Sequence, residues 1–115
     1  MARVLRTGNY RVKEELKRRG VEKLKTIPGC TTYGIPQILE GSSMKNFHPE
    51  ANVKEAFYIG IDVRTDGVSA YDKAYPERVI SFGRRMERQH PGYLVHWDGR
   101  VDHPITMWVP ISALE

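Results

Sequence analysis

The second half of the chain alternates apolar and polar residues, a pattern typical of β-strands. Between residues 57 and 64 every second position is apolar, at Phe57, Ile59, Ile61 and Val63, so we predict a strand with Ile59 and Ile61 buried. Thr65-Asp66-Gly67 is a turn signal after which Val68–Tyr71 can return as the partner strand. Residues 93–97 and 105–109 alternate in the same way, and Pro110 ends the last of these strands or lies at a sheet edge.

The first third of the chain has the spacing of helices instead. From Tyr10 onward, Val12 and Leu16 lie four residues apart on one face, with lysines and arginines on the other. Gly20 is placed to end this helix as its C′ residue, and a short turn over 21–25 follows. Residues 35–40 can form another short helix with Pro36 at its first position, ended by Gly41.

Two middle segments have less regular patterns. Residues 41–54 read as a long surface loop, a type of segment that is often functional or mobile. In residues 77–89, Val79, Phe82 and Met86 have helical spacing, whereas Ile80, Phe82 and Met86 also fit a strand. Pro76, suited to a first helical position, favours the helix.

These elements predict one α+β domain, in which short basic N-terminal helices precede a small antiparallel β-sheet. Its parts are an arm over 1–9, a basic helical segment over 10–40, a loop over 41–54 and the sheet over 55–115. The length of 115 residues and the 40% hydrophobic and 28% charged content fit a single folded core. The segments Gly92–Gly99 and Trp108–Glu115 resemble the last strands of small SH3-like barrels, and this resemblance implies a barrel form of the sheet.

Charge is concentrated at the N-terminus. Residues 1–30 hold nine Lys and Arg against three Glu, a net of +6, while the remaining residues hold nine against eleven acids, a net of −2. A local cationic excess points to an anionic partner, nucleic acid first, because rows of Lys and Arg neutralise phosphates. The residues expected to contact it are Arg11, Lys13, Lys17, Arg18, Arg19 and Lys23. The alternative is a solvated helix face with an internal Glu14–Arg18 pair.

The stretch Leu24–Thr32, with its Ile27-Pro28-Gly29 turn, resembles the hairpin of helix-hairpin-helix DNA-binding motifs. In that family the hairpin joins two helices and offers backbone N–H groups to a phosphate. The resemblance covers about ten residues. It departs from the pattern because Thr31 replaces the usual second glycine, and because Gly34 and Pro36 interrupt the helix that should follow.

The aromatic residues support a second reading. Tyr58, Tyr93, Trp97 and Trp108 lie in predicted strands, where outward rings could anchor a protein partner or stack on bases. The alternative is that these rings close a small core. An exposed aromatic sheet with the 41–54 loop would suit a protein-interaction module, such as a phage- or mobile-element-encoded regulator or inhibitor of a host protein.

Candidate catalytic residues are few. His90, His96 and His103, with Asp98 and Asp102, could converge around one hairpin and serve a small metal- or His-dependent nuclease, but their spacing matches no known metal or catalytic pattern. Cys30, the single cysteine, excludes an internal disulfide and a thiolate-rich zinc site. We therefore expect a non-enzymatic binding protein with no metal and no cofactor. The absence of a long apolar run and of a leader pattern predicts no membrane partner and a cytoplasmic location.

Overall fold

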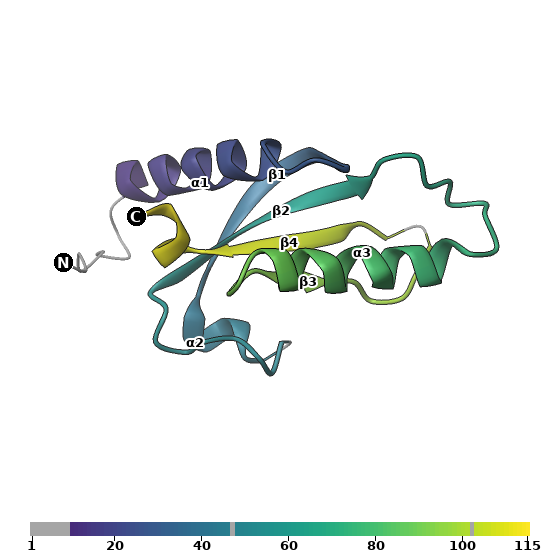
Figure 1. Ribbon diagram of the computed structural model, residues 1–115. Helices are drawn as coiled ribbons and strands as arrows, with labels where there is room; N and C mark the ends of the chain where they lie inside the picture. Colours follow the sequence, from purple (N-terminus) through teal and green to yellow (C-terminus); the bar gives the residue numbers. More distant parts are fainter. Residues whose placement is uncertain (1–9, 47, 102) are drawn as a thin grey trace.

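The computed structural model describes residues 10–46, 48–101 and 103–115, and the expected arm over 1–9 lies outside them. Helices and strands alternate along this part of the chain up to β3, which β4 follows directly (Figure 1). Their order is α1 (Tyr10–Lys25), β1 (Cys30–Glu40), α2 (Gly41–Met44), β2 (Phe57–Thr65), α3 (Tyr75–Gln89), β3 (Leu94–His96), β4 (Ile105–Pro110) and the 3-10 turn η1 (Ile111–Leu114). The α+β class predicted from the sequence is confirmed.

The strands of the described chain form one four-stranded antiparallel sheet in the order β1-β2-β4-β3. In the centre of the sheet, Ile59 of β2 lies opposite Ile38 of β1 and Val109 of β4. The outer strands, β1 and β3, lie at opposite edges and do not pair with each other. The sheet is therefore open, and the expected SH3-like barrel is wrong.

Helices α1 and α3 cover one face of this sheet, and the core lies beneath them. Leu24 of α1 and Phe82 and Met86 of α3 share one buried cluster with Ile61 and other strand residues. Ile59 and Ile61 are 0% and 3% exposed, which confirms their predicted burial. The helix side of the sheet is thus the main hydrophobic interior.

Helix α1 continues through Gly20, where the sequence pattern predicts an end. Gly20 is buried against the sheet, and a Cβ atom there would lie 2.7 Å from Cγ2 of Ile59. Its role is to let the helix approach β2 closely, so it lies inside α1 rather than capping it. The helix then reaches Lys25 in one piece.

The opposite face is partly covered by α2 and the chain that follows it. Met44 and Ala51 pack on Tyr58, Leu94 and Trp108 in a second buried cluster. The Tyr58 hydroxyl accepts a hydrogen bond from the Asn52 backbone N–H at 2.9 Å. The predicted 41–54 loop therefore begins with a short helix and is attached to the sheet.

Residues 35–40 form the second half of β1, so the helix expected there is wrong, and the basic helical segment ends before residue 30. The strand accommodates Gly34 at φ +82° and shifts register between Tyr33 and Gln37, next to Pro36. An edge strand tolerates a proline and a bulge because its outer N–H groups need no ladder partner. This strand also replaces the second helix that the helix-hairpin-helix resemblance requires.

The segment between β2 and α3 contains no returning strand. The expected strand over Val68–Tyr71 is wrong, because both sides of β2 are occupied by β1 and β4. Instead, residues 66–74 form turns in which Asp72 Oδ1 accepts a hydrogen bond from the Ala74 backbone N–H, just before α3. The helix favoured over 77–89 is confirmed, and it interrupts the predicted 55–115 sheet.

Candidate anion-binding cleft

Two of the six cations expected to bind nucleic acid pair with carboxylates of α1 itself. Lys17 pairs with Glu14 at 3.2 Å, and Arg18 pairs with both Glu15 and Glu22. The hydrogen bonds that Arg18 donates to these carboxylates raise the pKa of its guanidinium, and they lower the pKa of Glu15. The pairing differs from the expected Glu14–Arg18 pair, but it has the same effect of neutralising charge on this face of the helix.

Two further cations of α1 bind the C-terminal end of the chain. The Arg19 guanidinium donates to the carbonyl of Leu114, and the Lys23 ammonium donates to the carbonyl of Ala113. These contacts fasten η1 beside α1 (Figure 1). Arg11 and Lys13 form no ion pair with any described residue.

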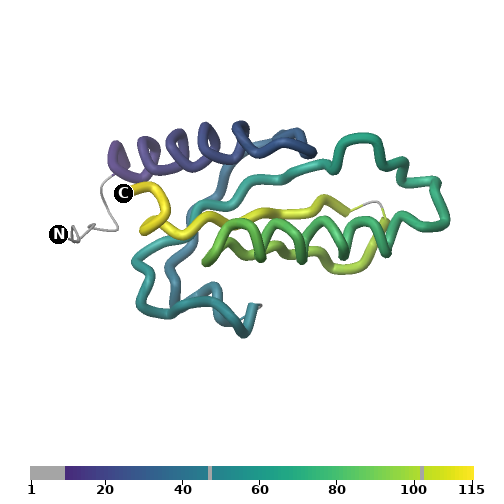
Figure 2. Tube along the Cα trace, in the orientation of Figure 1, coloured from purple at the N-terminus to yellow at the C-terminus, as the bar shows by residue number. Residues whose placement is uncertain are grey.

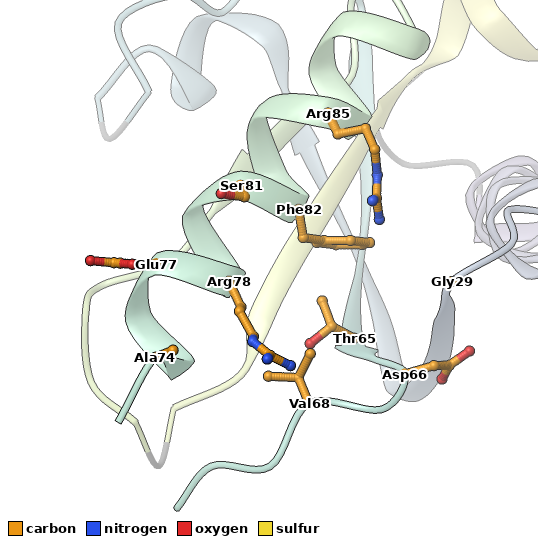
Figure 3. A pocket seen from close by; sticks show the side chains of 10 residues that line it. All are labelled: Gly29, Thr65, Asp66, Val68, Ala74, Glu77, Arg78, Ser81, Phe82 and Arg85. Atoms are coloured by element: carbon orange, nitrogen blue, oxygen red, sulfur yellow. The ribbon is translucent and has the colours of Figure 1, made fainter. Parts of the chain in front are cut away.

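A cleft lies between α3 and the turn that joins α1 to β1. Its volume is about 450 Å³, and Figure 3 shows its lining. The floor and sides comprise Gly29, Thr65, Asp66, Val68, Ala74, Glu77, Arg78, Ser81, Phe82 and Arg85. Arg78 and Arg85 extend from α3 on the same side as Phe82, towards Thr65 and Gly29. The cleft is therefore a hollow with two guanidinium groups at its rim.

The helical spacing of α3 creates this arrangement. Arg78, Phe82 and Arg85 lie at i, i+4 and i+7, so they share one side of the helix. Phe82 is buried in the core, and the arginines flank it towards solvent. The Arg85 guanidinium carbon lies 5.8 Å from the centroid of the Phe82 ring. A Cβ atom on Gly29 would lie 3.7 Å from Arg85 Nη2, so this arginine reaches across to the α1–β1 turn.

The carboxylates around the cleft leave its positive charge largely uncompensated. Arg85 has no ion pair within the described part of the chain, and Arg78 has only a 4.0 Å contact with Asp72. Asp66 accepts a 2.8 Å hydrogen bond from Thr31 Oγ1, and in Figure 3 the carboxylates of Asp66 and Glu77 point away from the arginines. Guanidinium pairs of this kind suit bidentate binding of a phosphate or carboxylate.

Arg78 and Arg85 are not identified as site residues by the sequence analysis. The hydrophobic pattern of residues 77–89 fits both a helix and a strand, and only a helix places these two arginines on the same face of the element. Their seven-residue separation around Phe82 is the signal that could have found them. Contact with the Gly29 turn could not be read from the sequence, because it joins residues that are more than fifty positions apart.

The predicted aromatic partner surface is wrong for three of its four residues. Tyr58, Tyr93 and Trp108 are 2%, 4% and 3% exposed, so a partner cannot reach their rings. Tyr58 and Trp108 are covered by Met44 and Ala51, and Tyr93 belongs to the core beneath α3. Trp97 is half-buried, and its indole N–H donates to the carbonyl of Arg100 at 3.0 Å. The rings close the interior because the 41–56 segment and α3 cover both faces of the sheet.

Among the described candidate catalytic residues, the structure joins His103 to Asp98, whereas His90 and His96 contact other partners. The His90 ring stacks on Tyr93 with centroids 4.9 Å apart, His96 lies opposite Thr106 in the sheet, and His103 contacts Asp98. Asp102 lies outside the described residues. Residues 10–46, 48–101 and 103–115 contain no group of three or more His, Cys, Asp or Glu side chains placed to hold a metal ion. Burial raises the pKa of the Cys30 thiol, which disfavours the nucleophilic thiolate.

In the described part of the chain, no helix is both long and apolar enough to cross a membrane.

The fold and the cleft define a two-layer α+β protein with an arginine-rimmed hollow on its helical side. No family model, curated protein or solved structure gives a significant match to this chain.

Proposed function

We propose that this protein is a non-enzymatic nucleic-acid-binding protein that contacts phosphates through its helical side. The observation that carries the proposal is the cleft at α3, where Arg78 and Arg85 face one hollow and Arg85 has no ion pair in the described chain. Exposed arginines that lack a carboxylate partner can exchange their counterions for phosphates, which is the main source of affinity for nucleic acid.

The positive charge of α1 supports phosphate binding on the same, helical side of the molecule. Among the six sequence-predicted positions, Arg11 and Lys13 are the two that pair with no carboxylate and bind no backbone carbonyl of a described residue, so we expect them to contribute most. Lys17 and Arg18 would have to exchange their glutamate partners for phosphate. Arg19 and Lys23 would have to release the C-terminal carbonyls.

The test is fluorescence anisotropy with labelled 20-nucleotide DNA, single-stranded and duplex, over a range of KCl concentrations. Replacing Arg78 and Arg85 together with Ala should weaken binding to unrelated sequences alike. On single strands it should also lower the slope of log K against log salt by about 0.7 for each lost phosphate contact.

The matched control replaces Lys45 and Lys54 with Ala, which removes two exposed charges from the segment on the other face of the sheet. We expect the control to retain the wild-type slope. A slope that changes equally in both double variants would show that net charge, rather than the cleft, determines binding. Wild-type protein that binds no oligonucleotide at low salt would overturn the proposed function.

A further inference from the structure

A second hollow lies beside the arginine cleft, at the end of the sheet where β2 leads into residues 66–74. Its volume is about 500 Å³, and tyrosines from three segments line it: Tyr33 of β1, Tyr71 of the 66–74 segment and Tyr75 at the start of α3. Val101 and Pro104, from the segment just before β4, also line it. We call this site the tyrosine hollow.

Two of its rings are accessible. Tyr71 is 98% exposed and Tyr33 is 39% exposed, in contrast to the buried Tyr58 and Tyr93. Tyr75 is held edge-on by Trp97, with ring centroids 6.0 Å apart, so it forms a fixed wall. Exposed rings around a concave surface provide faces on which another planar group can stack.

The hollow also carries positive charge. The Arg64 guanidinium carbon lies 5.3 Å from the centroid of the Tyr33 ring, and Arg64 has no ion pair within the described chain. An arginine above an aromatic ring can bind a phosphate while the ring stacks on the adjoining base. Ring and charge together therefore match a nucleotide better than they match an apolar peptide.

The two hollows share one wall. Val68 lines both the arginine cleft and the tyrosine hollow, so the 66–74 segment separates them. Figure 2 shows this segment, in teal to green, extending beyond the ends of the neighbouring strands and helix. A flexible strand that crosses it can place phosphates at Arg78 and Arg85 and bases beside Tyr33 and Tyr71.

We infer that the ligand is single-stranded nucleic acid, whose unpaired bases stack in the tyrosine hollow. This inference rests on the proposed function and adds the strandedness of the ligand. A duplex keeps its bases paired and stacked inside the helix, so it can use the arginine cleft but not the tyrosines.

Three labelled ligands test the inference by anisotropy at one salt concentration: a 20-nucleotide oligothymidine, an abasic strand with the same phosphates, and a duplex of the same length. Wild-type protein should bind oligothymidine more tightly than the other two. Tyr71→Ala should weaken oligothymidine binding by about 5- to 150-fold, the range expected for losing one stacked base. It should leave abasic binding and the salt slope unchanged.

Two control variants sharpen the result. Tyr71→Phe retains the ring and should bind as wild type does, and Tyr10→Ala, which removes a 73% exposed tyrosine from α1, should also leave binding unchanged. Because Tyr71 is almost fully exposed, its substitution should not alter the circular dichroism spectrum.

The outcomes separate the inference from the proposed function. Equal affinity for oligothymidine and the abasic strand, or a Tyr71→Ala variant with wild-type affinity, would overturn the tyrosine hollow while binding that depends on Arg78 and Arg85 remained. Failure of wild-type protein to bind any of the three ligands would overturn the proposed function, and this inference with it.

Discussion

Gly20 lies in the middle of α1, on the side of the helix that faces Ile59 of β2. At most helix positions, alanine is more favourable than glycine by up to about 1 kcal/mol. At Gly20 the geometry reverses this preference, because an added Cβ would come within 2.7 Å of Cγ2 and 2.9 Å of Cβ of the fully buried Ile59. The missing side chain sets the distance between the helix and the sheet.

We therefore predict that Gly20→Ala lowers the free energy of unfolding by about 1–3 kcal/mol, the usual cost of overpacking a core. Urea denaturation at neutral pH measures the change. Gly83→Ala in α3 is the matched control, since a Cβ there would lie 3.2 Å from Val95 Cγ1, and a smaller loss is expected. A Gly20→Ala variant more stable than wild type would mean that helix propensity outweighs the contact.

At the scale of elements, His48 and Glu87 join the chain after α2 to α3. His48 Nε2 lies 4.0 Å from Glu87 Oε2, and both side chains are largely buried. Burial raises the pKa of the Glu87 carboxyl; His48 and the Val95 backbone N–H oppose this shift, and Glu50 adds to it. Burial therefore favours the protonated form of Glu87 in the folded protein relative to the unfolded chain, and the His48 contact only partly offsets it.

A carboxyl whose pKa is raised by folding binds more protons in the folded state, so its contribution to stability falls as the pH rises through the raised pKa. We predict that the free energy of unfolding of wild type, relative to that of Glu87→Gln, declines as the pH rises above the ordinary glutamate value of 4.5. Parallel urea titrations of the two proteins measure the difference. A wild-type advantage that grows with pH would contradict the assignment.

At the scale of the whole molecule, the described histidines are distributed over separate parts of the fold. His48 faces α3, His90 stacks on Tyr93, His96 lies in β3, and His103 contacts Asp98 in the turn before β4. The backbone N–H of Arg100 and the His103 side chain lower the pKa of Asp98, so this carboxylate already has partners. Nothing in these contacts brings three metal ligands together.

We predict that the purified protein holds no stoichiometric zinc and that a chelator leaves its melting temperature unchanged. A structural metal would stabilise the folded state, and its removal would lower that temperature. Elemental analysis and thermal denaturation with and without EDTA make the measurement. About one zinc per chain, lost in a His96→Ala and His103→Ala double variant, would support the nuclease reading instead.

The elements that could be read from the sequence are those whose own residues carry a clear period. Alternation over residues 57–64 identified β2 and its buried Ile59 and Ile61, because a strand with one strongly apolar face has little freedom in register. Val12 and Leu16 indicated α1, and Pro76 favoured α3. In each case the information lies within a few neighbouring residues.

The remaining features depend on partners that are distant in sequence. Cys30–Glu40 is a strand because β2 provides its hydrogen bonds, although Gly34 and Pro36 obscure the local pattern. Tyr58 and Trp108 are buried because the segment after α2 covers them. The arginine cleft exists because the sheet brings the Gly29 turn beside α3. The sequence by itself determined the class of fold and the central strand, whereas tertiary packing decided which polar and aromatic side chains remain accessible, since burial depends on what folds over each residue.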